Sequence, residues 1–90
     1  MSEAYTVHAE YRFADGEVLR VGDLWRDRGG SIRDTYRVKA IRNYRRSGLQ
    51  VVVDIIRRER DGQVTEPGTE TQWPVAALFD GRIVRDGGDS

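Results

Sequence analysis

Cysteine is absent from this chain of 90 residues, and histidine occurs only once, at His8. Without cysteine there is no disulfide, no thiolate metal site and no cysteine nucleophile, which is consistent with a reducing cytosol. A single histidine also excludes the usual transition-metal clusters. We therefore expect no metal and no other cofactor, and we expect a cytoplasmic protein.

Long apolar runs are also missing. No segment approaches the roughly 20 apolar residues that a helix needs to span a bilayer. The first five residues lack a basic segment followed by an apolar one, so we expect no signal peptide. The sequence therefore predicts no association with a membrane.

Catalytic motifs are scarce. His8 lies on the polar face of an alternating segment, with no hydroxyl nucleophile at a recognisable motif. Gly29-Gly30 lacks the Lys and the Ser or Thr that follow in a phosphate-binding loop. An enzyme built on paired carboxylates stays a remote alternative, with candidate acids at Asp23, Asp27, Asp54, Glu66 and Glu70. For Asp54, in mid-strand, we favour a cross-strand ion pair with Arg37, Lys39 or another arginine over catalysis. We predict that the protein is not an enzyme.

Lysine is nearly absent, since Lys39 is the single lysine among 15 basic residues. Arginine binds phosphate and carboxylate groups in a planar, bidentate way. We favour codon bias in a GC-rich genome as the reason for the excess, because the arginines are spread over nearly the whole chain. The net charge is zero, but nine basic and three acidic residues between Arg33 and Arg60 leave that segment at +6. A zero total argues against a protein that coats polyanions, and it leaves room for a local basic face.

Alternation of apolar and polar residues predicts strands along most of the chain. Tyr5–Phe13 reads as one half-buried strand, and Thr35–Arg60 reads as two long strands around a tight turn at 45–48. Asp61-Gly62 predicts a second hairpin, and residues 74–79 predict one helical turn that begins with proline. We predict a single all-β domain over residues 1–85, with five or six strands, and a disordered tail at 86–90. Its architecture would be a small barrel or a strongly bent antiparallel sheet.

A family resemblance supports the barrel. The relevant segments are Gly22-Asp23-Leu24-Trp25, Tyr36-Arg37-Val38, Val51-Val52-Val53 and Trp73-Pro74 followed by Leu78-Phe79. Their layout resembles that of small bacterial SH3-like barrel domains of uncharacterised function. The resemblance covers roughly residues 22 to 84 and implies a fold and a bacterial source. It implies no catalytic residues.

The basic hairpin is the first candidate site. Its cations are Arg37, Lys39, Arg42, Arg45, Arg46, Arg57, Arg58 and Arg60. With Tyr36 and Tyr44 interleaved, such a face has the chemistry of a single-strand nucleic-acid binder. The alternative, which we favour, is a solvated hairpin whose arginines pair with acidic residues elsewhere in the chain.

A peptide groove is the second candidate site. Its residues would be Trp25, Tyr36, Trp73 and Pro74, provided that the two tryptophans are adjacent and partly exposed. Open strand edges offer self-association, which the charges on the hairpin oppose. Because the net charge is zero, we expect a non-enzymatic module that binds protein or belongs to a larger assembly. Nucleic-acid binding through residues 35–60 is the alternative, and the oligomeric state stays open.

Overall fold

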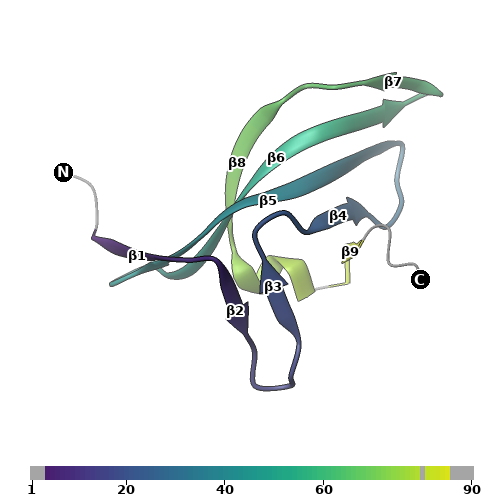
Figure 1. Cartoon of the computed structure of the whole chain (residues 1–90). Helices are drawn as coiled ribbons and strands as arrows, with labels where there is room; N and C mark the ends of the chain where they lie inside the picture. The colour runs from purple at the N-terminus through teal and green to yellow at the C-terminus, as the bar shows by residue number, and fades with distance from the viewer. Residues whose placement is uncertain (1–3, 80, 86–90) are drawn as a thin grey trace.

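A computed structural model describes residues 4–79 and 81–85 (Figure 1). The tail predicted at 86–90 lies outside the described residues. The elements in chain order are β1 (Tyr5–His8), β2 (Glu10–Arg12), β3 (Val18–Arg20), β4 (Leu24–Asp27), β5 (Ile32–Tyr44), β6 (Gly48–Arg60), β7 (Gln63–Thr65), β8 (Thr69–Pro74), the 3-10 helix η1 (Val75–Phe79) and β9 (Ile83–Arg85). The all-β prediction and the helical turn near 74–79 are confirmed. The described residues form nine strands where the sequence predicted five or six.

A long hairpin of β5 and β6 forms the centre of the fold. Its register runs from Ile32 opposite Arg60 to Tyr44 opposite Gly48. Gly48 has a φ of 80°, which glycine adopts without the steric cost that other residues meet, and this allows the tight reversal. The paired ribbon predicted over residues 35–60 is therefore confirmed.

The main sheet is antiparallel, with the order β7-β6-β5-β4-β9. In addition, β1 pairs with β5 and β8 pairs with β6, while β2 and β3 form a separate two-stranded sheet. One edge of β5 pairs with β6. The other edge pairs with β4 along residues 35–37 and with β1 along residues 41–44. The main sheet is not closed into a barrel, so the predicted SH3-like barrel is not confirmed.

Two bulges interrupt the central hairpin. Ile56 is the extra residue in β6, and Lys39 is the extra residue in β5, because Val38 pairs with Val53 while Ala40 already pairs with Val52. A bulge bends its strand and increases the local twist. The bulge at Lys39 therefore bends β5 in the middle of the hairpin.

The N-terminal segment differs from its prediction. Residues Tyr5 to Phe13 form two strands with different partners, and Ala9 between them accepts a hydrogen bond from the Val21 amide at 3.0 Å. Tyr11 and Phe13 pack against the core, whereas Tyr5 is 44% and Val7 67% exposed. The prediction of a single half-buried strand was wrong, because the chain changes its pairing partner at Ala9.

One hydrophobic core underlies the hairpin. Its buried members are Leu19, Trp25, Tyr36, Val38, Ile41, Val51, Val53, Val75 and Leu78. Val52 points to the opposite face of β6 and is also buried, so β6 is covered on both faces, as its apolar run predicts. No helix in residues 4–79 or 81–85 is both long and apolar enough to cross a membrane.

Candidate binding surface at the hairpin tip

The eight predicted cations do not converge on one face. Arg45 and Arg46 lie at the turn between β5 and β6, and Arg57, Arg58 and Arg60 lie at the opposite end of β6 (Figure 1). A strand of 13 residues spans about 40 Å at about 3.3 Å per residue. The hairpin therefore holds the arginines of the turn far from those at residues 57–60.

Among these cations, Arg58 and Lys39 pair with acids. The Arg58 guanidinium donates two hydrogen bonds, of 2.8 and 3.0 Å, to the two carboxylate oxygens of Asp34, which is buried. Lys39 Nζ donates to Glu70 Oε1 at 2.7 Å, and this bond raises the pKa of Lys39 and lowers the pKa of Glu70. Lys39 therefore pairs with an acid outside the hairpin, as the favoured interpretation has it, whereas Asp34, the partner of Arg58, belongs to β5 of the same hairpin.

Asp34 belongs to a polar network that links β4 and β5. Asp27 accepts a hydrogen bond from the Tyr36 hydroxyl at 2.8 Å and another from the Asp34 amide at 2.9 Å. Burial raises the pKa of Tyr36 well above its ordinary value, and the hydrogen bond to Asp27 adds to the shift. Because its members hydrogen-bond to one another, this network stabilises the fold. Asp54 is half-buried opposite Arg37 and helps to raise the pKa of Lys39.

The predicted peptide groove does not form from its four residues. Trp25 and Tyr36 are 3% and 6% exposed, and the Arg85 guanidinium covers the Trp25 ring at 4.7 Å. Trp73 is half-buried with its ring 4.7 Å from that of Tyr36, and only Pro74 is exposed. The small core takes these aromatic rings into its interior. Trp25 and Trp73 therefore contribute to the core, and the structure does not show the predicted groove between partly exposed tryptophans.

A different aromatic pair lies on the surface, where β1 meets the end of β5. Tyr5 lies opposite Tyr44, with ring centroids 4.9 Å apart and ring planes at 48°. The Arg42 guanidinium lies 4.9 Å from the centre of the Tyr5 ring and donates to the Tyr44 hydroxyl at 3.4 Å. That hydroxyl in turn donates to Gln72 of β8 at 3.3 Å. These contacts hold the pair in one orientation.

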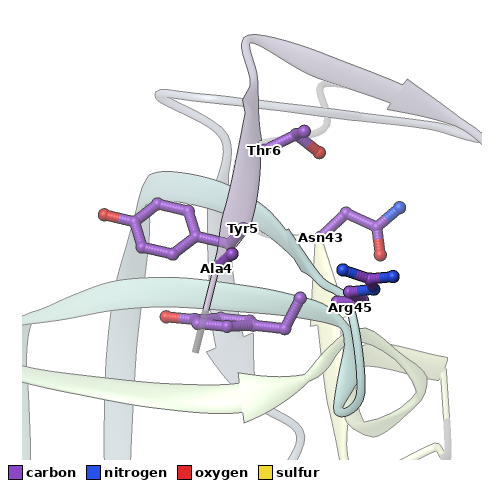
Figure 2. A pocket seen from close by; sticks show the side chains of 6 residues that line it. Ala4, Tyr5, Thr6, Asn43 and Arg45 are labelled. Carbon is purple, nitrogen blue, oxygen red and sulfur yellow. The ribbon is translucent and has the colours of Figure 1, made fainter. Parts of the chain in front are cut away.

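A shallow depression of about 450 Å³ adjoins this pair (Figure 2). It is lined by Ala4, Tyr5, Thr6, Asn43, Tyr44 and Arg45. Figure 2 shows the Tyr5 ring on one side of β1 and the Asn43 and Arg45 side chains on the other. We call these six residues together with Arg42 the hairpin tip.

The hairpin tip is locally basic. Residues 4–8 and 41–49 contain three arginines and no acidic residue. Arg45 is exposed, and its guanidinium has no acidic partner among residues 4–79 and 81–85. Sequence reasoning identified the arginines and Tyr44, but it missed Tyr5, Thr6 and Asn43. Only the pairing of β1 with β5 brings these residues together.

Within the described part of the chain, no group of three or more His, Cys, Asp or Glu residues has the arrangement of a metal site. Comparisons with models of protein families, with curated proteins and with solved structures found no match. The chemistry of the hairpin tip is thus the basis for a functional proposal.

Proposed function

We propose that this protein is a small, non-enzymatic binding module that engages a protein partner through the hairpin tip. The observation that carries the proposal is the exposed Tyr5 ring, packed on the half-buried Tyr44, beside arginines in two segments, 4–8 and 41–49, that contain no acidic residue. Elsewhere on the hairpin, Lys39 and Arg58 are neutralised by Glu70 and Asp34. The hairpin tip is where cationic and aromatic side chains remain available together.

Tyrosine and arginine are enriched among the residues that dominate protein interfaces, because each offers a large contact area together with hydrogen-bonding groups. Tyr5 keeps 44% of its surface exposed, and its orientation is already set by Arg42 and Tyr44. An anchor that is held in place before binding loses little conformational entropy when the partner arrives. The positive charge favours an acidic partner.

Nucleic-acid binding is the competing function. Single-strand binders combine a continuous basic groove with open aromatic faces on which bases stack. Here the arginines of the turn and those at 57–60 lie at opposite ends of the hairpin, and the Tyr5 ring already contacts both Arg42 and Tyr44. The protein as a whole is also neutral. A protein partner therefore fits the tip better.

Fluorescence anisotropy with three labelled probes tests the proposal: a short peptide of alternating glutamate and valine, its lysine-valine counterpart and oligothymidine. We expect the acidic peptide to bind best and Arg45→Glu to weaken that binding by at least about tenfold. Arg57→Glu is the matched control, since Arg57 is also exposed but lies at the far end of the hairpin, and it should leave the affinity unchanged.

Preferential binding of oligothymidine, with affinity falling steeply as salt rises, would replace the proposal with the nucleic-acid alternative. An equal loss in Arg45→Glu and Arg57→Glu would mean that the tip has no special role. The resemblance to SH3-like barrel domains, the bacterial source and the cytoplasmic location remain predictions, and binding at the tip does not depend on them.

A further inference from the structure

Strand β1 is the outermost strand on its side of the main sheet. One of its edges pairs with β5, and no strand in residues 4–79 or 81–85 pairs with the other. Figure 1 shows β1 beside the turn end of the hairpin, apart from the bulk of the sheet. An open edge of this kind presents unpaired peptide groups to any extended chain that approaches it.

One backbone hydrogen bond beside β1 shows which of its residues direct their N–H and C=O groups toward β5. The Arg45 amide donates to the Ala4 carbonyl at 3.2 Å, while Tyr5 lies opposite Tyr44. In an antiparallel pair, hydrogen-bonded and non-hydrogen-bonded positions alternate, so Tyr5 and Val7 occupy the non-hydrogen-bonded positions. Their N–H and C=O groups therefore point away from β5, toward the open edge. Both residues can donate and accept there without disturbing the existing ladder.

The same two residues expose their side chains. Tyr5 is 44% and Val7 67% exposed, and the register places Arg42 across from Val7 on the same face. A strand added to this edge would lay alternate side chains beside Tyr5 and Val7 on one face and beside Thr6 on the other. Arg42 and Arg45 would then lie within reach of acidic side chains on the added strand.

We propose that the open edge of β1 takes up an extended, acidic segment of a partner protein as an additional strand. This inference rests on the proposed function and specifies its mode of binding. The backbone groups of Tyr5 and Val7 supply affinity, and the arginines of the hairpin tip select for acidic side chains. A second copy of this chain fits the edge poorly. Edge-to-edge pairing of two β1 strands would bring together two copies of residues 41–49, each with three arginines and no acidic residue.

The variant Val7→Pro tests the inference, because it removes an outward amide hydrogen that β5 does not use and leaves the side-chain charges unchanged. In the anisotropy assay with the glutamate-valine peptide, we expect Val7→Pro to weaken binding by at least about tenfold. The matched control Val7→Thr keeps the amide hydrogen and a β-branched side chain, and its affinity should change by less than about twofold.

A second measurement acts on the ligand, so it does not depend on how the variant folds. The glutamate-valine peptide with N-methyl groups along one edge keeps every side chain but cannot pair as a strand on that edge. When the methylated edge faces β1, binding should be lost to the same extent as in Val7→Pro, and methylation of the opposite edge should be harmless.

The outcomes separate the two proposals. If Arg45→Glu weakens binding while Val7→Pro and the N-methylated peptides bind normally, the hairpin tip is a binding surface and strand addition is wrong. If none of these changes affects binding, or if the acidic peptide does not bind even at millimolar concentration, both proposals fail.

Discussion

Removing the hydroxyl of Tyr36 should destabilise the fold at neutral pH. The hydroxyl donates to Asp27 at 2.8 Å, and Tyr36 is 6% exposed. A hydrogen bond to a charged acceptor contributes about 1.5–3 kcal/mol. In Tyr36→Phe, Asp27 keeps its hydrogen bond from the Asp34 amide. We therefore expect the unfolding free energy to fall by about 1.5–2 kcal/mol, near the lower end of that range. In a domain of this size that corresponds to a fall in Tm of roughly 10 °C.

The same substitution should change the response to alkali. Burial raises the pKa of Tyr36 above its ordinary value of 10.0, so the unfolded chain loses this proton at a lower pH than the folded protein does. The stability from the protonated hydroxyl is complete below pH 10 and is lost as pH rises toward the folded pKa. The slope for one proton is about 1.4 kcal/mol per pH unit. Between about pH 8 and pH 11, the wild type should therefore lose about 1.4 kcal/mol more than Tyr36→Phe.

Urea unfolding followed by tryptophan fluorescence at the two pH values measures both effects. Tyr11→Phe is the control, since the Tyr11 hydroxyl makes no side-chain hydrogen bond within residues 4–79 and 81–85 and its removal should be nearly neutral. The reasoning is refuted if Tyr36→Phe and the wild type lose the same stability between the two pH values.

Three further predictions concern stability, and urea unfolding measures each of them. Leu19→Ala should cost about 2–4 kcal/mol because Leu19 is fully buried and ties β3 to the core, whereas Val21→Ala, at an exposed position, should stay within about 0.5 kcal/mol; equal costs would mean that β3 does not pack as described. Asp61 has a positive φ of 52°, so Asp61→Val should lose about 1–2 kcal/mol and Asp61→Gly should lose less, and the reverse order would contradict the turn. The bond from Lys39 lowers the pKa of Glu70 below its ordinary 4.5, so its contribution is present above that pH and lost as pH falls through the folded pKa. In Glu70→Gln the unfolding free energy should therefore fall less steeply as the pH is lowered below about 4.5. An unchanged dependence on pH would argue against the Lys39–Glu70 pair.

The central hairpin could be predicted from the sequence because its signals are local. Alternating residues and a glycine at the reversal specify β5, β6 and their turn, and the run Val51–Val53 specifies a strand covered on both faces. Local signals also place Val75 and Leu78 in a helical turn after Pro74.

The candidate site could not be predicted in the same way, because it depends on pairing between distant segments. The break at Ala9 carries no glycine or proline, so the alternation of Tyr5–Phe13 looks continuous although its two halves join different sheets. Similarly, the arginines at 45–46 and 57–60 lie close in sequence, yet strands of 13 residues hold them at opposite ends. The burial of Trp25 depends on which strands cover it, which the residue type alone does not specify.

Amide hydrogen exchange of the wild-type protein, measured by NMR with and without the glutamate-valine peptide, tests the central claim most directly. We predict that exchange slows at Tyr5 and Val7, whose amides face the open edge, and changes little at Thr6, which already pairs with β5. Slowed exchange confined to residues 57–60 or to Trp73 and its neighbours, with Tyr5 and Val7 unaffected, would contradict it.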